Sequence, residues 1–166
     1  RRRINALNVY PVPDGDTGTN LALTMRGIVD ALDRSTASTT AELAAEAQRA
    51  ATMEAKGNSG VILSTIVRGL ATALAEHDQV DASTLAEALR AGATGAYEAV
   101  KEPVEGTMLT VIREMAEEAE RPDVLVLPVE QALGRALARG EDTVARTPEL
   151  LDKLHEAGVV DAGDVG

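Results

Sequence analysis

The stretch with the most chemical potential is NVYPVPDGDTGTN, residues 8–20. It places two carboxylates, Asp14 and Asp16, two residues apart in a glycine-containing loop, so both can turn toward one hard cation. Magnesium suits such a pair, because it uses few protein carboxylates and is often completed by waters and substrate phosphates. The stretch therefore favours a magnesium site made by Asp14 and Asp16.

Other uses of this loop compete with magnesium. A calcium-binding EF-hand starting at Asp14 would need an acidic ligand at its twelfth position, which is Met25. An aspartate phosphatase motif would need threonine where Gly18 stands, and Pro11 and Pro13 disfavour the strand that precedes such a motif. The third alternative stays open: Asp, Gly, Thr and Asn also simply turn a chain and cap a helix.

Two shorter motifs share the same double interpretation. GNSG (57–60) and EGTM (105–108) combine glycines, which admit a ligand close to the backbone, with helix starts, whose free N–H groups attract anions. In the plain alternative, Ser59 and Thr107 cap helices and Met108 packs in the core. Neither GxxxxGK[ST] nor GxGxxG occurs in the sequence, so a nucleotide site here is neither a P-loop nor a Rossmann site.

Apolar periodicity and capping signals predict the elements that position these motifs. The first helix carries an apolar stripe of Leu21, Met25, Ile28, Val29 and Leu32. Thr39 with Glu42 and Thr84 with Glu87 form capping-box patterns, and Thr147 followed by Pro148 marks a further helix start. Only 124–127 retains a strand-like run. The predicted helices cover about 19–34, 39–56, 58–76, 84–100, 107–120, 128–146 and 148–157, which indicates an all-α antiparallel array.

Alternating helix direction has a consequence for the motifs. The first, third and fifth helices begin at the same end, which brings DGDTGTN, GNSG and EGTM together in a site large enough for phosphates. Asp161 joins them only if the helix over 148–157 lies across that end. His77 and His155 lie in polar surroundings, and we expect both to be solvated.

Composition excludes several functional classes. The 166 residues fit a single domain, and the core must be built without Phe, Trp or Cys. A net charge of -11 disfavours nucleic acid as a partner, because such binders need a basic face. No apolar run approaches the roughly 20 residues that span a bilayer, so we expect no membrane span and a location compatible with the cytoplasm. The start at Arg1 and the end at Gly166 suggest a fragment of a longer multidomain chain.

Four blocks together carry a family resemblance: INALNVYPVPDGDTGTNLALTM, KGNSGVILSTIVRG, KEPVEGTMLTVIREMAEEA and TPELLDKLHEAGVVDAG. They resemble, in the same order, the N-terminal kinase domain of bacterial fatty acid kinase, the ATP-binding subunit that works with DegV-type fatty-acid-binding proteins. This domain is similar to the L subunit of dihydroxyacetone kinase. The resemblance implies an antiparallel eight-helix barrel that binds ATP or ADP with two Mg²⁺ ions at one end.

The resemblance also assigns residues. Asp14 and Asp16 would bind the ions and act in catalysis, and Asn8 stands, with one residue of extra spacing, where the dihydroxyacetone kinase pattern has a third aspartate. After VVDAG the chain reads DVG, whereas the family usually continues with a Gly-Lys-Gly-like sequence. The nucleotide-binding residues implied by the resemblance are Thr17, Gly18, Thr19, Asn20, Asn58, Ser59, Gly60, Thr107, Met108, Asp161, Ala162 and Gly163.

The implied reaction is phosphoryl transfer from ATP to the carboxylate of a fatty acid that a DegV-type partner presents. A carboxylate attacks without a general base, which fits a site without a well-placed histidine. A dihydroxyacetone-type polyol kinase subunit and a non-catalytic nucleotide-binding regulatory module are the alternatives. The two prolines of NVYPVPDGDTGTN favour the fatty acid kinase branch, and the resemblance is compatible with a homodimer formed through a part of the protein outside this chain.

Overall fold

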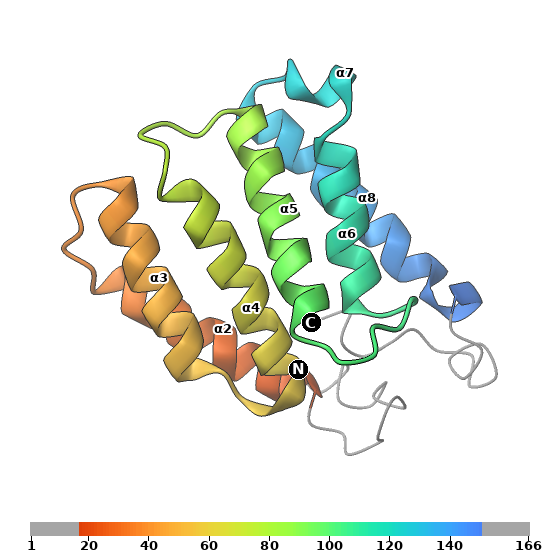
Figure 1. Cartoon of the computed structure of the whole chain (residues 1–166), viewed down its shortest axis with the longest axis horizontal. Helices are drawn as coiled ribbons and strands as arrows, with labels where there is room; N and C mark the ends of the chain where they lie inside the picture. Colours follow the sequence, from red (N-terminus) through yellow and green to blue (C-terminus); the bar gives the residue numbers. More distant parts are fainter. Residues whose placement is uncertain (1–16, 151–166) are drawn as a thin grey trace.

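The structure is a computed structural model that describes residues 17–150, with side chains described through residue 146. Within that range the chain is entirely helical and forms no strand, which confirms the predicted all-α class. The helices, shown in Figure 1, are α2 (Thr17–Asp33), α3 (Thr40–Glu54), α4 (Gly57–Leu74), α5 (Ala82–Glu98), α6 (Met108–Ala119), α7 (Pro122–Leu125) and α8 (Val129–Leu150).

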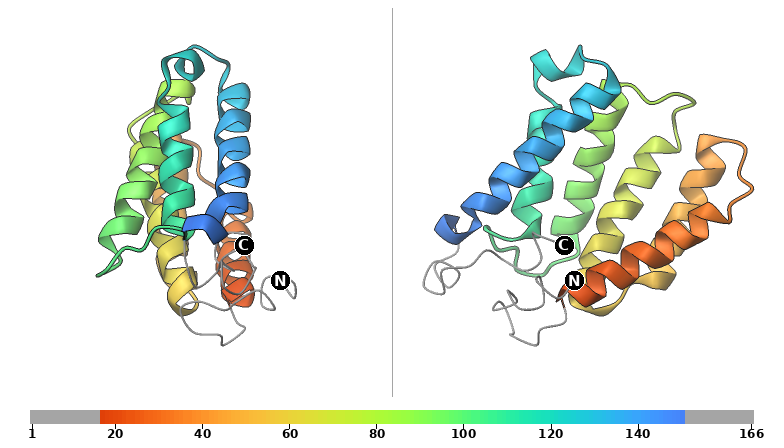
Figure 2. Two further views of the ribbon diagram at one scale, coloured as in Figure 1. Left: turned by 90° about the vertical axis from the view of Figure 1, so that its right-hand side faces the viewer. Right: turned by 180° about the vertical axis from the view of Figure 1, so that it is seen from behind.

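The long helices run antiparallel to their neighbours in the chain. α4, α5 and α6 lie side by side, with α3 beside α4 at one edge (Figure 1). α2 packs on α3 and α4, whereas α8 packs on α6 and α5, and both cover the same face of the layer (Figure 2). Among the described helices, α2 and α8 do not contact each other, so closure into an eight-helix barrel stays a prediction.

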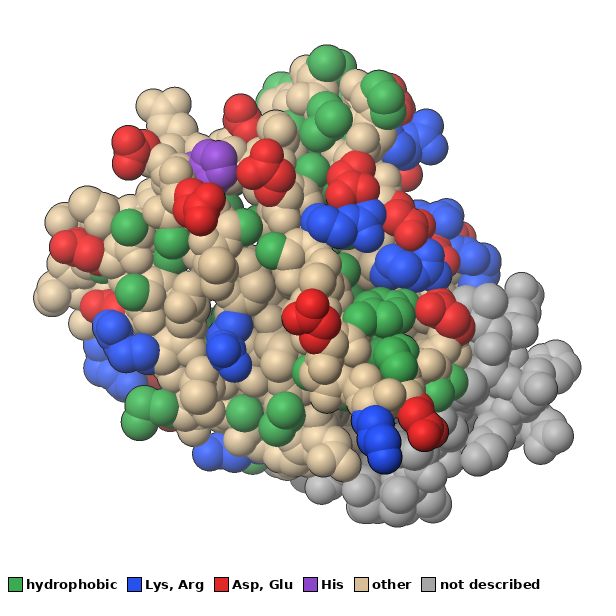
Figure 3. Space-filling view, viewed as in Figure 1, with side chains coloured by type: hydrophobic (Ala, Val, Ile, Leu, Met, Phe, Trp, Pro, Cys, Tyr) green, Lys and Arg blue, Asp and Glu red, His purple; other side chains and the backbone are tan. Residues whose placement is uncertain are grey.

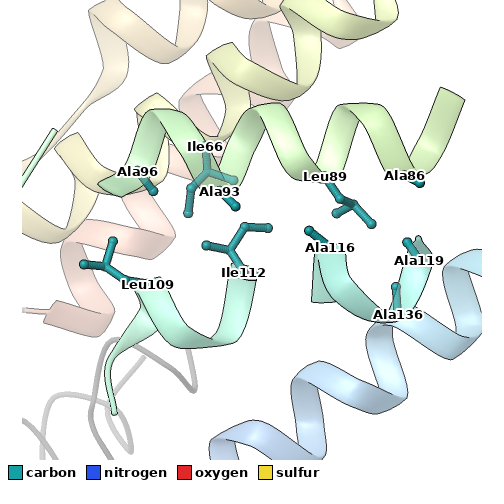
Figure 4. Packing of buried hydrophobic residues seen from close by; sticks show 10 residues of the cluster. All are labelled: Ile66, Ala86, Leu89, Ala93, Ala96, Leu109, Ile112, Ala116, Ala119 and Ala136. Atoms are coloured by element: carbon teal, nitrogen blue, oxygen red, sulfur yellow. The ribbon is translucent and has the colours of Figure 1, made fainter. Parts of the chain in front are cut away.

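Small side chains build the interface between the central helices. The main cluster, shown in Figure 4, contains Ile66, Ala86, Leu89, Ala93, Ala96, Leu109, Ile112, Ala116, Ala119 and Ala136. Alanine lets helix axes approach closely, and Gly69 goes further, because an added Cβ there would lie under 3.0 Å from the backbone of Ala91. This close packing replaces the bulk of the absent Phe and Trp side chains.

The helix starts confirm one capping prediction and correct another. Thr39 caps α3 as expected, since its Oγ1 accepts a hydrogen bond from the Glu42 N–H at 3.2 Å. The expectation that Thr84 caps the next helix is wrong. Asp81 is the N-cap of α5, and its Oδ1 accepts from the Thr84 N–H at 2.8 Å and from the Thr84 hydroxyl at 3.0 Å. Aspartate is a strong N-cap, and the observed N-cap lies three residues before the predicted one.

The C-terminal half brings two further corrections. The strand-like run 124–127 is not a strand, because Pro122 starts the short helix α7, in which Val124 is fully buried against Ala82 and Ala132. The predicted break at Thr147 is also wrong, because α8 continues through Pro148 to Leu150. The rest of the helix predicted over 148–157 lies outside the described residues.

Candidate functional site

Three helix starts meet at one end of the molecule. α2 begins at Thr17, α4 at Gly57 and α6 at Met108, and all three starts lie at the lower end in Figures 1 and 2. The direction argument made from the sequence is therefore confirmed for the three helix starts, whereas residues 14–16 of the first motif lie outside the described residues. A helix start presents unpaired backbone N–H groups and the positive end of the helix dipole, so this end favours an anionic ligand.

The starts of α2 and α4 touch each other through glycines. Gly57 has φ of +63°, a conformation that favours glycine, and an added Cβ there would lie under 3.0 Å from the Asn20 amide. Gly60 has the same relation to Thr24, whose Oγ1 an added Cβ would approach to under 3.0 Å. Two of the predicted nucleotide-binding motifs, 17–20 and 58–60, are thus brought into one surface.

Thr24 joins the two helices further. Its side chain is fully buried, and its Oγ1 accepts a hydrogen bond of 3.0 Å from the backbone N–H of Lys56, the residue before α4. The hydroxyl therefore replaces a partner that the helix start would otherwise lack. Thr24 was not predicted as a site residue, because its role arises from a residue 32 positions away in the chain.

The first turn of α4 carries unused polar groups. Asn58 is exposed and Ser59 is half-buried, and neither side chain hydrogen-bonds to any residue in the described part of the chain. The alternative in which Ser59 caps the helix is wrong, because Lys56 occupies the N-cap position and makes no side-chain cap. The first N–H groups of a helix have no partner within the helix, so together with these two polar side chains they form a donor set suited to phosphate oxygens.

At the start of α6 the structural alternative, in which Thr107 caps the helix and Met108 packs in the core, is confirmed. Thr107 is the N-cap: its Oγ1 accepts from the Leu109 N–H at 3.4 Å and donates to the Val104 carbonyl at 2.8 Å. Met108 packs against the main apolar cluster. Both residues lie at the predicted end of the molecule, and their contact with a nucleotide stays a prediction.

A charged cluster that the sequence interpretation missed lies beside Thr107. Glu105 accepts hydrogen bonds from the Tyr97 hydroxyl at 2.8 Å, the Thr110 hydroxyl at 2.8 Å and the Arg113 guanidinium at 2.9 Å. Burial raises the pKa of Glu105, but these three donors outweigh it and leave the pKa below its ordinary value. Glu105 stands within EGTM, but its partners come from two different helices, so spacing alone does not reveal the cluster.

Six of the assigned residues lie outside the described residues: Asn8, Asp14, Asp16, Asp161, Ala162 and Gly163. Their roles as metal or nucleotide ligands therefore stay predictions. Between residues 17 and 150, no group of three or more His, Cys, Asp or Glu side chains is arranged to hold a metal ion. His77 lies between α4 and α5, its Nε2 3.3 Å from a Glu87 carboxylate oxygen, at the end away from the candidate site.

The surface carries both signs of charge. Figure 3 shows acidic and basic side chains interspersed on the visible face, without a continuous basic patch. Among the described helices, none has both the length and the apolar character that crossing a bilayer requires.

Comparison with known proteins identifies the family. The model of the DAK2 domain matches residues 11–166. The chain is 41% identical over 167 residues to an uncharacterized protein of Staphylococcus saprophyticus and 40% identical over 167 residues to one of Staphylococcus haemolyticus. It is 38% identical over 163 residues to an uncharacterized protein of Staphylococcus aureus. Each match covers 98% of this chain and 30% of the relative, so the chain spans about 30% of the length of these curated relatives. A family match over nearly the whole chain, on an all-helical structure, means that the chain belongs to the DAK2 domain family.

Proposed function

We propose that this chain is an ATP- and Mg²⁺-dependent kinase domain that transfers phosphate to the carboxylate of a fatty acid presented by a DegV-type binding protein. The observation that carries the nucleotide part is the convergence of the α2, α4 and α6 starts at one end, with Asn58 and Ser59 unpaired there among the described residues. The DAK2 domain match over residues 11–166 supports the kinase class.

The chemical groups at this end of the molecule are of the types that bind an adenine nucleotide with magnesium. The first-turn N–H groups of α4, with the side chains of Asn58 and Ser59, would bind phosphate oxygens. Asp14 and Asp16 offer hard oxygen ligands and would hold Mg²⁺, which, when bound, neutralises charge on the transferring phosphoryl group. Gly57 and Gly60 let α2 pack closely on the start of α4, with the Asn20 and Thr24 side chains against them, which holds the motifs 17–20 and 58–60 in one surface.

The proposed reaction needs positioning more than proton transfer. A fatty acid carboxylate oxygen forms a bond to the γ-phosphorus while the bond from that phosphorus to the β–γ bridging oxygen breaks, which yields an acyl phosphate and ADP. The carboxylate has no proton to lose, so no residue of this chain is needed as a general base. The acceptor is expected on the partner protein, and this chain would supply the phosphate-binding end.

The first experiment measures binding of ADP with Mg²⁺ by isothermal titration calorimetry. We expect the parent chain to bind, and Asp14→Ala and Asp16→Ala each to abolish Mg²⁺-dependent binding while the far-UV circular dichroism spectrum stays helical. Asp33→Ala is the matched control, because Asp33 ends α2 at the opposite end of the same helix and is exposed. Parent-like binding by either Asp14→Ala or Asp16→Ala would contradict the metal assignment.

The second experiment separates the acceptor classes. Acyl phosphate, trapped with hydroxylamine, is measured with fatty acid alone and with fatty acid bound to a DegV-type protein. We expect little or no product from this chain with free fatty acid and clear product with the partner. Rapid product from free fatty acid would refute the partner requirement. Turnover with dihydroxyacetone instead would indicate a polyol kinase, and nucleotide binding without turnover on either acceptor would indicate a regulatory module.

A further inference from the structure

The loop between α5 and α6 is held almost entirely by side chains. Between residues 101 and 106 it makes no backbone–backbone hydrogen bond within the described part of the chain. Gly106 has φ of +83°, and its N–H donates to the Thr110 hydroxyl at 2.9 Å. The loop leads directly into Thr107 and Met108, so whatever fixes the loop also fixes the start of α6.

Glu105 is the centre of this arrangement. Its Oε1 accepts from the Tyr97 hydroxyl on α5, and its Oε2 accepts from Thr110 and Arg113 on α6. The same Thr110 hydroxyl that donates to Glu105 accepts from the Gly106 N–H. Arg113 also lies 3.3 Å from the Tyr97 oxygen and 2.8 Å from Glu117. One carboxylate thus ties the loop to both helices that flank it.

The hydrogen bonds that Glu105 already accepts limit what its carboxylate can do. Both of its oxygens accept hydrogen bonds from protein donors, and its lowered pKa keeps it ionised near neutrality. It is therefore poorly suited to take up a proton or to bind a cation, but well suited to hold neighbouring groups in place. Because Glu105 is exposed and Arg113 about a third exposed, the cluster adds little to overall stability. The main effect of the cluster in the structure is therefore to hold the loop between α5 and α6, which is a positioning role.

We propose that Glu105, Tyr97 and Arg113 are positioning residues that fix the Gly106–Met108 turn at the nucleotide end and so set nucleotide affinity without contacting the nucleotide. This inference rests on the proposed nucleotide-binding function. Residues that orient ligand-binding groups from behind change affinity by roughly 10- to 100-fold when removed, as is seen for the hydrogen-bond partners of metal ligands.

A second ion pair provides a matched control. Arg90 on α5 and Glu120 at the end of α6 form a two-point contact, with Nε to Oε1 at 2.7 Å and Nη2 to Oε2 at 2.5 Å. Like the Glu105 cluster it joins α5 to α6, and both its side chains are 40% exposed. It lies at the other end of α6, so its loss should affect stability to a similar degree without moving the Gly106–Met108 turn.

The experiment compares Glu105→Gln, Tyr97→Phe and Glu120→Gln in the full chain. Glu105→Gln keeps the size of the side chain but turns an amide N–H toward groups that donate. Tyr97→Phe removes one of the three donors to Glu105, together with the longer hydrogen bond that the Tyr97 oxygen accepts from Arg113. We expect Kd for ADP with Mg²⁺ to rise about tenfold or more for Glu105→Gln and less for Tyr97→Phe, with no change for Glu120→Gln. Measured at a temperature well below every Tm, this pattern is not produced by a general loss of stability.

Amide hydrogen exchange without nucleotide gives an independent readout. We expect faster exchange at Gly106 in Glu105→Gln than in the parent chain and in Glu120→Gln. If the parent binds ADP and Glu105→Gln binds it equally well, the inference is wrong although the proposed function stands. If the parent itself binds no ADP, the proposed function fails and the affinity claim fails with it. Unchanged exchange at Gly106 in Glu105→Gln would overturn the positioning role in either case.

Discussion

A change at Gly60 tests the contact that joins the starts of α2 and α4. Gly60→Ala adds a methyl group that would lie under 3.0 Å from the Thr24 Oγ1, where ordinary contact begins at 3.4 Å. Thr24 has little freedom to yield, because it is fully buried and its Oγ1 accepts from the Lys56 N–H. The change is therefore expected to strain the surface that carries the candidate phosphate site.

Two opposing effects set the size of the change. Replacing glycine by alanine inside a helix stabilises by up to about 1 kcal/mol. Forcing an extra methyl group into a packed site typically costs about 1–3 kcal/mol. We therefore expect Gly60→Ala to lower the free energy of unfolding by roughly 0–3 kcal/mol in the parent chain, the difference between these two ranges.

In a Thr24→Ala background the same change should reverse its sign. Without Oγ1, the nearest atoms to the added methyl group are at 3.6 Å, which is ordinary contact. Only the helix-forming advantage then remains, so Gly60→Ala should stabilise the Thr24→Ala chain by up to about 1 kcal/mol. The coupling energy between the two positions should be about 1–3 kcal/mol, the size of the relieved overlap.

Urea unfolding followed by far-UV circular dichroism measures the four members of this cycle. Gly134→Ala is the control, because Gly134 lies inside α8 and an added Cβ there meets no atom within 4 Å. It should stabilise by up to about 1 kcal/mol in either background. Additivity of Gly60→Ala and Thr24→Ala within about 0.5 kcal/mol would refute the proposed contact.

Three further predictions concern charge and capping. Glu114→Gln should lower the free energy of unfolding, measured in urea titrations, by about 1–3 kcal/mol, because only 9% of that side chain is exposed and it pairs with Arg139 and Arg146. The control Glu117→Gln, at an exposed position, should change the free energy of unfolding by about 0–1 kcal/mol. Burial raises the pKa of Glu114, but its hydrogen bonds and the two arginines outweigh burial and hold the pKa below its ordinary value of 4.5. The stabilising effect of the ionised Glu114 is therefore complete above pH 4.5 and is lost as the pH falls through the lower folded-state pKa. The urea midpoint should drop in that acid range, and it should drop less steeply in Glu114→Gln. Thr107→Ala should lower the free energy of unfolding by about 1 kcal/mol because the N-cap of α6 is lost, whereas Ser59→Ala should change it little because Ser59 does not cap α4. In both variants the rise in Tm on adding ATP and Mg²⁺ should be smaller than in the parent chain, and a full rise in both would exclude a ligand role for these two residues.

Local patterns were reliable where the physics is local. The 3.6-residue apolar period placed α2, α3, α4 and α6 within about two residues of the observed bounds, because a helix must bury one stripe wherever it packs. Caps formed by a single nearby hydroxyl, at Thr39 and Thr107, followed in the same way. Where two capping residues compete, as Asp81 and Thr84 do, the pattern gave the wrong start.

Exposure within a stripe depends on which helices are present to cover it. Met25 and Val29 belong to the apolar stripe of α2, yet they are 41% and 45% exposed, because the described helices cover only the Leu21 and Ile28 side. Periodicity gives the direction of an apolar face but not the width of the surface that its neighbours bury. The continuation of α8 through Pro148 is a second difference from the local pattern. Thr147 followed by Pro148 matches the pattern of a helix start, and a proline inside a helix removes a backbone hydrogen bond, so the sequence alone predicts a break there.

The sequence by itself determined the all-α class, the order and direction of the helices, and the end at which the starts of α2, α4 and α6 meet, because each depends on periodicity and on the alternation of antiparallel helices. Only the tertiary structure decided which side chains hold that end together. Thr24 meets Lys56 and Gly60 across two helices, and Glu105 joins Tyr97 to Arg113. Such contacts depend on the distances between helix axes and on side-chain rotamers. Gly57, Gly60 and Gly69 allow short distances because they have no Cβ atom, and the local sequence pattern does not predict which neighbouring helix will occupy that space.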